Sequence, residues 1–480
     1  MTDSGASRPE KRLVARAVVL KKGEYVKVIK IGGGCLKGRK NIAHILDLLS
    51  ERGLGNIVVV SAINGVTDFL IQGTREALES EEKIPEIIGG IKRKHMAVAR
   101  HVFRREASAN RFGRDLDRML RELERFYFGL NFTREISIRM IDMISSYGER
   151  ISAELLAAAL RSRQVEATCR MPHLLGIQTD GKFGDATADL RATARNLKNH
   201  LVPLLGEDRV VFMPGFFGVS ERGDITTFGR GGSDYSAAVV AAALGADVLE
   251  VWKDVDGYMS ADPGFVPGAC LIPALSYDEA AELSYFGAKI LHPRTVEPLR
   301  RSRLSIVIKN TLDPDGPGSL ITAKSTKSGH TIKSVAYDTD IGILKVHASG
   351  VGARPGILAL VSNRLTEAGI NIKSVVTSQT CISILLARRD TEEGRRALQE
   401  LRPKPYRKLE KTEDVALVSL VGRGLNRHKG IAAQCFTAVA ERGVNVEMIS
   451  FGPSRVALYF IVRTGDLRKA VGAIHETFFP

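Results

Sequence analysis

The stretch Tyr25-Val26-Lys27-Val28-Ile29-Lys30-Ile31, followed directly by Gly32-Gly33-Gly34, decides the fold class. Its first seven residues are rich in β-branched side chains and predict a buried strand, and a helical pattern over residues 41–49 follows the glycines. The apolar run Ile57-Val58-Val59-Val60 repeats this arrangement and leads into another helical segment. Apolar strands that alternate with helices predict an α/β fold with a parallel sheet covered on both faces.

Size and charge narrow the class of partner. The chain has 480 residues, which favours roughly three domains over a single core. Its formal net charge of +15 attracts anions at long range. Only 6% of the residues are aromatic, and the sequence has no RNA-binding aromatic motif and no zinc-ligand spacing. We therefore expect small acidic metabolites or nucleotides as partners, and no nucleic acid.

The spacing of the cysteines and the length of the apolar runs predict the cellular compartment of the protein. The five cysteines are scattered without a CxxC pair, which argues against a disulfide framework or a structural metal site. Residues 1–12 lack the apolar segment of a secretory signal, and no apolar stretch approaches the roughly 20 residues that span a bilayer. We expect a cytoplasmic protein with no membrane contact, whose residues 1–22 form a disordered tail.

Further elements follow along the chain. The pattern from Ile91 to Leu130 is helical and rich in arginine and acidic residues, which is typical of a solvated, salt-bridged helix face. Later strands are predicted at residues 210–212, 249–252 and 305–308, and the spacing of Ser276 and Glu279 indicates a capping box that opens a helix.

The C-terminal part contains an internal repeat. Gly356-Ile357 and Gly369-Ile370-Asn371-Ile372 reappear, at a constant spacing, as Gly430-Ile431 and Gly443-Val444-Asn445-Val446. Each copy is read as a strand, a glycine turn, an amphipathic helix, a Gly-x-Asn turn and two further strands, which is the order of a ferredoxin-like unit. The boundary with the α/β part is expected in the polar run 323–333.

Two glycine-rich segments are candidate anion sites. Bare N–H groups after Lys30 can converge on phosphate oxygens, while its ammonium neutralises charge on a transferring phosphoryl group. Arg39-Lys40 excludes a Walker A loop, and Lys37 excludes a dinucleotide fingerprint. A purely structural turn is the alternative.

The second segment, residues 226–236, combines three glycines, an arginine and two N-capping residue types at one helix N-terminus. Arg230 can clamp a carboxylate with two hydrogen bonds. Simple capping by Ser233 or Asp234 is the alternative, but capping needs neither Arg230 nor so many glycines. The carboxylate-rich loop from Lys253 to Pro263 also follows a strand, where ligand loops of α/β sheets lie, although a solvated turn gives the same pattern.

Together these motifs resemble those of the aspartate kinases of the amino-acid-kinase family, over nearly the whole chain. The matching stretches are Lys30-Ile31-Gly32-Gly33, Val59-Val60-Ser61-Ala62 with Gly65-Val66-Thr67, Ser146-Tyr147-Gly148-Glu149-Arg150-Ile151-Ser152, Gly229 to Ser236, and Phe286-Gly287-Ala288-Lys289-Ile290-Leu291-His292-Pro293. The repeated tail resembles the tandem ACT domains of the same enzymes, the first of which is usually inserted within the second.

The resemblance implies a carbamate-kinase-like three-layer αβα sandwich over residues 23–325, followed by two ferredoxin-like ACT domains at 335–405 and 412–480. It implies transfer of the γ-phosphoryl group of ATP, carried with Mg²⁺, to the side-chain carboxylate of L-aspartate. The product, 4-phospho-L-aspartate, opens the synthesis of lysine, threonine and methionine, or of ectoine. It further implies a homodimer or a dimer of dimers formed through the ACT domains.

The resemblance also implies roles for individual residues. Lys30 stabilises the transferring phosphoryl group, and Asp234 organises the catalytic lysines. Glu149 receives the substrate ammonium, while Arg230, Thr67 and Ser233 hold the rest of aspartate. The nucleotide-binding residues are Lys30, Gly32, Gly33, Lys253, Asp254 and Lys289, and no residue is expected to bind a metal directly. The effector candidates are Asn371, Ser378, Gln379 and Asn445.

Several positions depart from the family pattern. Gly34-Cys35 replaces the usual Thr-Ser after the glycines, and Lys253, Met259 and Gly264 stand where many bacterial members have Thr, Tyr and Arg. The effector loop is shortened to residues 379–383, so inhibition by lysine or threonine is not implied. Two alternatives to an aspartate kinase stay open: a catalytically silent ACT protein that senses an amino acid, and a kinase of a related acid such as glutamate.

Overall fold

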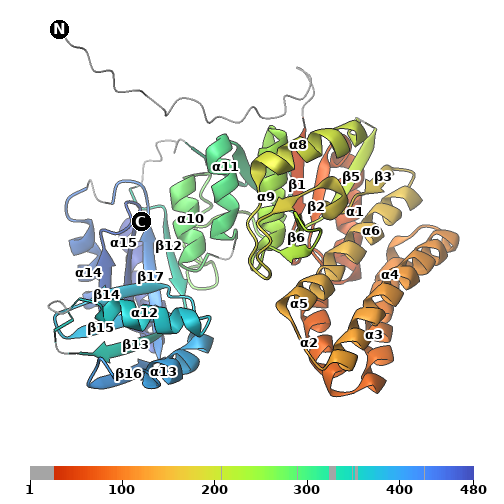
Figure 1. Cartoon of the computed structure of the whole chain (residues 1–480). Helices are drawn as coiled ribbons and strands as arrows, with labels where there is room; N and C mark the ends of the chain where they lie inside the picture. The colour runs from red at the N-terminus through yellow and green to blue at the C-terminus, as the bar shows by residue number, and fades with distance from the viewer. Residues whose placement is uncertain are drawn as a thin grey trace, which may run out of the picture. The chain divides into compact units, whose positions relative to one another are not determined.

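The computed structural model describes residues 26–206, 208–288, 290–323, 331–348, 350–351, 355–425 and 428–479. The chain divides into two compact units (Figure 1). The first comprises the residues up to Gly257 together with residues from Leu291 to 323, and the second comprises Tyr258–Ile290 and the C-terminal remainder. The predicted disordered tail, 1–22, lies outside the described residues. None of the helices in the described part of the chain combines the length and the apolar character that a bilayer span requires.

The first unit is built on a mostly parallel sheet, as predicted. Its strands lie in the order β3 (Glu166–Cys169), β5 (Arg209–Pro214), β2 (Ile57–Val60), β1 (Lys27–Ile31), β8 (Val248–Lys253), β10 (Ser305–Asn310) and β11 (Ser319–Thr322). Among these seven strands, the β10–β11 pair is antiparallel and the other neighbouring pairs are parallel. In the centre, Lys30 is in register with Val59 of β2 and Val251 of β8. The carboxyl ends of these strands therefore meet at one edge of the sheet.

Helices cover both faces of this sheet, which gives the expected three-layer sandwich. Alternation along β1 sends Ile29 and Ile31 into a core formed with α1 (Gly38–Arg52) and α6 (Tyr147–Ser162), while Lys30 points to the opposite face. That face is covered by α9 (Gly232–Leu244), which packs against β1 and is buried almost all round, as its alanine-rich sequence requires. Lys30 thus projects toward the N-terminus of α9.

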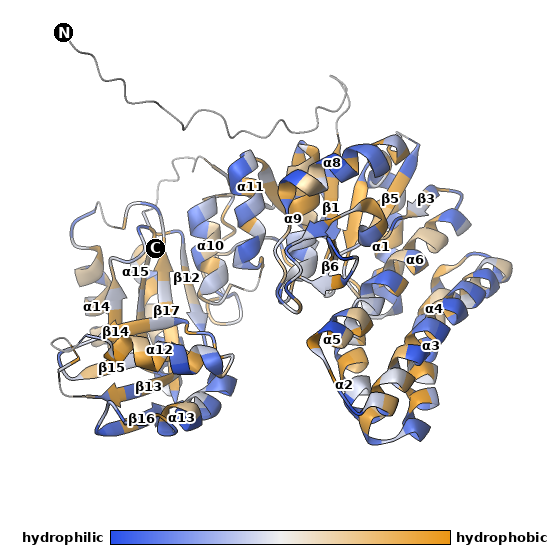
Figure 2. Ribbon diagram, in the orientation of Figure 1, coloured by the Kyte–Doolittle hydropathy of each residue, from blue (hydrophilic) through white to orange (hydrophobic). Residues whose placement is uncertain are grey.

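The arginine-rich segment forms a helical hairpin. The predicted single helical stretch is in fact two helices, α3 (Ile84–Val102) and α4 (Glu106–Thr133), because the chain becomes extended at Phe103. Their apolar sides pack together, and the arginines of the stretch are exposed. Figure 2 shows this hydrophilic outer side. The ion pairs Lys92–Asp117 and Arg118–Asp115, both 2.6 Å, confirm a solvated, salt-bridged face.

The second unit contains the predicted repeat as two four-stranded sheets. One has the order β14 (Ser374–Thr377), β15 (Cys381–Leu386), β13 (Gly342–His347), β16 (Lys408–Thr412), with α12 (Ile357–Glu367) and α13 (Thr391–Gln399). The other has the order β12 (Ser334–Asp338), β17 (Val415–Val421), β19 (Ala457–Arg463), β18 (Met448–Phe451), with α14 (Ile431–Glu441) and α15 (Leu467–Phe478). The chain therefore starts the second sheet, builds the whole first one, and returns.

Residues 258–290 group with the second unit although they precede the predicted boundary. The Ser276–Glu279 capping box is present at the start of α10 (Tyr277–Tyr285). The buried Glu279 also accepts hydrogen bonds from Lys333 Nζ (3.1 Å) and from the N–H of Arg423 (2.8 Å). A buried carboxylate needs such partners, which ties this segment to the C-terminal sheets. The domain limits 23–325, 335–405 and 412–480 stay predictions.

Candidate active site

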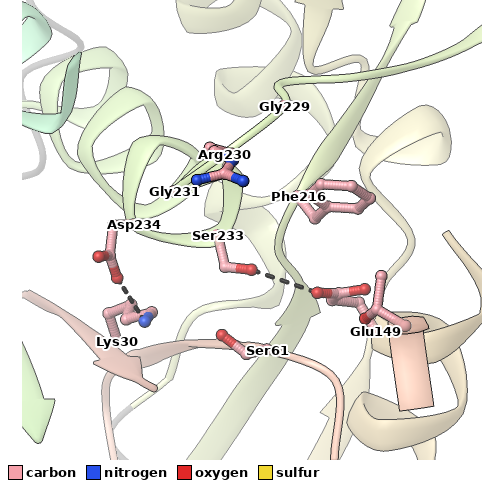
Figure 3. A pocket seen from close by; sticks show the side chains of 11 residues that line it. Lys30, Ser61, Glu149, Phe216, Gly229, Arg230, Gly231, Ser233 and Asp234 are labelled. Atoms are coloured by element: carbon pink, nitrogen blue, oxygen red, sulfur yellow. Dashed lines mark hydrogen bonds and ion pairs between the residues drawn. The ribbon is translucent and has the colours of Figure 1, made fainter. Parts of the chain in front are cut away.

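A cavity of about 280 Å³ lies at the carboxyl edge of the central sheet (Figure 3). Most of the residues that line it come from the two glycine-rich segments and from the two motifs between them, namely Lys30, Ser61, Thr67, Glu149, Gly229, Arg230, Gly231, Gly232, Ser233 and Asp234. Phe216, which belongs to none of these, also lines it. The structure thus brings together all six predicted catalytic and substrate-binding residues. The sequence order gives no hint that Phe216 joins them.

One end of the cavity carries a buried cluster of charges. Lys30 and Asp234 are only 3% and 7% exposed and form an ion pair, and Lys253 Nζ lies 3.5 Å from the other carboxylate oxygen of Asp234. Burial raises the pKa of Asp234, but the two lysines outweigh it, so this pKa lies below its usual value. Burial lowers the pKa of Lys30, with Asp234 opposing that shift. Asp234 therefore holds two cations beside the cavity.

The turn after β1 runs close to both lysines and to Asp254. A Cβ atom at Gly32 would lie 3.4 Å from Lys30 Nζ and 3.5 Å from Lys253 Cδ. A Cβ at Gly34 would lie 3.2 Å from a carboxylate oxygen of Asp254. The Asp254 carboxylate thus lies against Gly34, and a threonine side chain at position 34 would be too close to that carboxylate.

The opposite end of the cavity holds a second buried carboxylate, Glu149, near the start of α6. Its Oε1 accepts a hydrogen bond from Ser233 Oγ (3.3 Å), and its Oε2 has no hydrogen-bond partner among the described residues. Burial raises the pKa of Glu149 to about 7, against the opposing effects of the backbone N–H groups of Ala62 and Glu149, the Ser233 hydroxyl and the Lys30 charge. A buried, incompletely paired carboxylate points to a cation that a ligand supplies.

Thr67 reaches this end because α2 (Val66–Glu79) packs against Gly148. A Cβ at Gly148 would lie 2.9 Å from Cβ of Ala62 and 3.4 Å from Thr67 Oγ1. The Gly-Glu pair of the Ser-Tyr-Gly-Glu motif therefore serves two purposes. The glycine allows α2 and α6 to approach, and the glutamate faces the cavity.

The loop that carries Arg230 links β7 (Ile225–Thr227) to α9. Gly229 and Gly231 both have φ = 69°, a left-handed conformation that suits glycine. A Cβ at Gly231 would overlap Cβ of His292, and a Cβ at Gly232 would lie 2.8 Å from the Phe216 ring. Packing thus favours glycine at positions 231 and 232, and the left-handed turn favours it at positions 229 and 231. Arg230 itself is exposed and lines the cavity.

Two charged residues that sequence reasoning missed hold this loop in place. Asp142, on α5 (Ile138–Ser145), accepts hydrogen bonds from the backbone and hydroxyl of Thr227 (2.9 and 2.6 Å) and from the N–H of Gly184 (2.8 Å). Arg294 donates to Asp185 (2.6 Å) and to the carbonyl oxygens of Phe228 (3.0 Å) and Ala186 (2.7 Å). Arg294 directly follows the matched motif that ends at Pro293, whereas no signal marks Asp142.

The remaining predicted positions are only partly described. Lys289 lies outside the described residues. Cys35 is buried, its Sγ donates to the carbonyl oxygen of Trp252 (3.4 Å), and burial raises its pKa, so this thiol is a packed, neutral group. Gly33 follows Gly32 in the turn after β1. The nucleotide-binding roles of Gly32, Gly33, Lys253, Asp254 and Lys289 stay predictions.

The effector candidates all lie in the second unit. Ser378 and Gln379 form the turn between β14 and β15, where Ser378 Oγ accepts from the N–H of Cys381 (3.1 Å). Asn371 lies between α12 and β14, and Asn445 lies at the equivalent position between α14 and β18 of the other sheet. The two asparagines therefore occupy equivalent turns of the repeat, and their effector role stays a prediction.

Comparisons with known proteins agree with this geometry. The model of the amino acid kinase family matches residues 26–310, and an ACT domain model matches residues 418–478. Aspartokinase 1, chloroplastic, of Arabidopsis thaliana is 30% identical over 98% of this chain and 83% of its own length. Lysine-sensitive aspartokinase 3 of Escherichia coli is 30% identical over 94% of this chain and 99% of its own.

Solved structures extend the likeness to three dimensions. The crystal structure of E. coli aspartokinase III in complex with aspartate and ADP has a TM-score of 0.80 and 28% sequence identity, and the match covers 95% of this chain and 100% of that chain. The same enzyme in complex with lysine and aspartate also has a TM-score of 0.80, with 30% identity over 95% of this chain and 100% of that chain. The chain therefore belongs to the amino acid kinase family, and within it to the aspartokinases with C-terminal ACT domains.

Proposed function

We propose that the chain transfers the γ-phosphoryl group of ATP to the side-chain carboxylate of L-aspartate, forming ADP and 4-phospho-L-aspartate. One observation carries the proposal. A single cavity has the Lys30–Asp234 ion pair at one end, with Lys253 beside Asp234, and the incompletely paired Glu149 at the other. A zwitterionic acid fits between them, with its ammonium on Glu149 and its side-chain carboxylate toward the lysines.

The reaction demands little proton transfer from the protein. A carboxylate oxygen of aspartate forms the new bond to the γ-phosphorus, the bond from that phosphorus to the bridging oxygen breaks, and the electron pair leaves with ADP. The aspartate side chain is ionised at neutral pH, so no strong base is needed. The protein has to align two anions and offset their repulsion, and the ammonium of Lys30 supplies that charge at the reacting end.

The amino-acid end fixes the other groups of the substrate. Glu149 pairs with the ammonium, and Arg230 at the rim clamps the α-carboxylate. Thr67 and Ser233 complete the polar lining, and the hydrogen bond from Ser233 Oγ holds Glu149 in place. We assign the substrate-binding roles of Thr67, Glu149, Arg230 and Ser233 on this basis.

The nucleotide would lie over the turn after β1. Gly32 and Gly33 have no side chains that would block a phosphate there, Lys253 adds positive charge, and Asp254 lies beside Gly34. An Mg²⁺ ion would be held mainly by the phosphates of the bound nucleotide. When bound, Mg²⁺ neutralises phosphate charge and orients the γ-phosphoryl group.

The decisive test is an ADP-release assay with purified chain, ATP, Mg²⁺ and L-aspartate, with the acyl phosphate trapped by hydroxylamine. We expect aspartate-dependent ADP release and hydroxamate formation. A catalytically silent amino-acid sensor would instead show stabilisation by the amino acid without ADP release, and that result would refute the proposal. The buried Lys30–Asp234–Lys253 cluster supports the kinase, because a sensor has no use for such a phosphate-facing charge cluster.

For the second unit we propose an amino-acid effector site near Asn371, Ser378, Gln379 and Asn445, and a homodimer or dimer of dimers formed through the ACT sheets. Strands β14 and β18 lie at the edges of their sheets, where another strand or chain can be added. Inhibition assays with lysine and threonine, together with analytical ultracentrifugation, test these two points. A role in cytoplasmic lysine, threonine and methionine synthesis follows from the proposed reaction.

A further inference from the structure

Phe216 has a backbone conformation that is unusual for its residue type. It lies in the left-handed region with φ = 78°. Among the described residues, three other non-glycine residues have a positive φ, Arg134, Gln164 and Arg303, and none of them lines the cavity. Left-handed non-glycine residues are disfavoured and collect where surrounding structure holds them for a purpose. At Phe216, the conformation turns an aromatic ring into the cavity wall.

The surrounding structure holds Phe216 in this conformation from both sides. Its N–H donates to Ser236 Oγ (2.9 Å), and its carbonyl oxygen accepts from the N–H of Phe228 (2.8 Å). The ring packs so closely on Gly232 that a Cβ there would lie 2.8 Å from ring atom Cδ2. The ring is therefore fixed against the N-terminus of α9 and cannot easily swing out of the cavity.

The ring occupies the amino-acid end of the cavity. In Figure 3 the Lys30–Asp234 pair lies at the left and Phe216 lies at the right, above Glu149 and to the right of Arg230. The groups that bind the ammonium and the α-carboxylate thus surround the ring, and the reacting end faces it. The space between the ring and Lys30 is the space that the substrate carbon chain has to fill.

The polar groups at this end cannot tell aspartate from glutamate. Both acids present the same ammonium to Glu149 and the same α-carboxylate to Arg230. The two acids differ only by one methylene group in the side chain. Discrimination between them therefore requires a rigid wall that limits the length of the side chain that the site accepts. Among the described residues that line the cavity, Phe216 has the only hydrophobic side chain.

We propose that Phe216 is a specificity-determining residue, whose ring forms the back wall of the amino-acid site and sets the distance from the substrate α-carbon to Lys30. With the ring in place, the aspartate side chain ends where the phosphoryl group is transferred. Glutamate would have to move its α-carbon back into the ring or bend its side chain out of line. This inference rests on the proposed function.

The test compares variants of two neighbouring phenylalanines. Phe216→Gly removes the ring and suits the left-handed backbone, and Phe216→Leu shortens the wall. The matched control is Phe217→Leu, because Phe217 is fully buried and stacks on His173, 6.4 Å between ring centroids, away from the cavity lining. For each variant, kcat/KM is measured with L-aspartate and with L-glutamate, and circular dichroism and thermal melting check the fold.

We expect the aspartate-to-glutamate ratio of kcat/KM to fall by roughly 10- to 200-fold in Phe216→Gly, the range over which one methylene is discriminated in a pocket. Phe216→Leu should show a smaller fall, and Phe217→Leu should keep the wild-type ratio. An unchanged ratio in a folded, active Phe216 variant, or an equal fall in Phe217→Leu, overturns the inference alone. A wild-type chain that releases no ADP with aspartate overturns the proposed function and this inference with it.

Discussion

The two ends of the cavity hold buried carboxylates in opposite electrostatic situations. Asp234 has two lysine partners, and its pKa lies below the usual value despite burial. Glu149 has no cationic side chain paired with it among the described residues, accepts a hydrogen bond from Ser233, and has a pKa raised to about 7 by burial. The difference means that one end has its counter-ions within the protein, whereas under the proposed function the substrate ammonium supplies the counter-ion at the other.

The largest expected effect is on the free energy of unfolding, and substitutions of the carboxylates at the two ends of the cavity should change it differently. Asp234→Asn leaves Lys30 and Lys253 close together without their counter-ion, and removing one member of a buried pair costs about 3–5 kcal/mol. Glu149→Gln instead removes an incompletely paired buried charge. Since the raised pKa of Glu149 means that its contribution to stability is lost as pH rises through about 7, this variant should be neutral or stabilising at pH 8.

Urea unfolding of the ligand-free protein at pH 8 checks this contrast. Equal destabilisation by Asp234→Asn and Glu149→Gln would mean that the two carboxylates are not distinguished by their partners, and would break the comparison.

The next effect concerns turnover. Lys30→Met removes the cation at the reacting end, and we expect kcat to fall by roughly 100- to 1,000-fold, the scale of losing one preorganised charge contact. Lys27→Met is the matched control, because Lys27 lies on the same strand but pairs with Glu250 (2.9 Å) outside the cavity lining. The steady-state rate of ADP release is measured for both variants. A similar fall in kcat in both would argue against a specific role of Lys30.

A third effect sharpens the description of the amino-acid end. Because burial raises the pKa of Glu149 to about 7, lowering the pH protonates the carboxylate that receives the substrate ammonium. We expect the KM for aspartate to rise by about tenfold for each unit of pH below that value. In Glu149→Gln this dependence should disappear and KM should be high throughout. A flat wild-type profile between pH 6 and 8 would contradict the assignment.

The smallest expected effect concerns the clamp on the Arg230 loop. Arg294→Lys keeps the charge but loses the guanidinium that reaches Asp185 and two carbonyl oxygens at once. We expect kcat/KM for aspartate to fall by about tenfold through misplacement of the loop. Arg301→Lys is the control, because Arg301 forms only an exposed pair with Glu297 (3.3 Å) on α11 (Val296–Ser302). Equal activity of the two variants would remove Arg294 from the positioning residues.

Much of the site could be predicted from the sequence, because its residues lie in compact local motifs. Lys30 follows from a strand that runs into glycines, and Ser233 and Asp234 follow from the pattern at the start of α9. The helical hairpin was less predictable, since the break at Phe103 leaves the 3.6-residue period nearly intact on both sides. Asp142 and Arg294 were not predicted, because a residue that acts by holding a distant loop has no local sequence pattern of its own.

The sequence by itself determined the parallel sheet, the two glycine-rich anion segments and the repeated C-terminal unit, because hydrophobic period and glycine placement are local properties of the chain. Only the tertiary structure decided that Gly231 and Gly232 lack side chains because His292 and Phe216 pack on them, and that β12 pairs with β17 while β16 pairs with β13. It also decided which buried carboxylate has cationic partners. These properties depend on contacts between segments far apart in the chain, which only folding brings together.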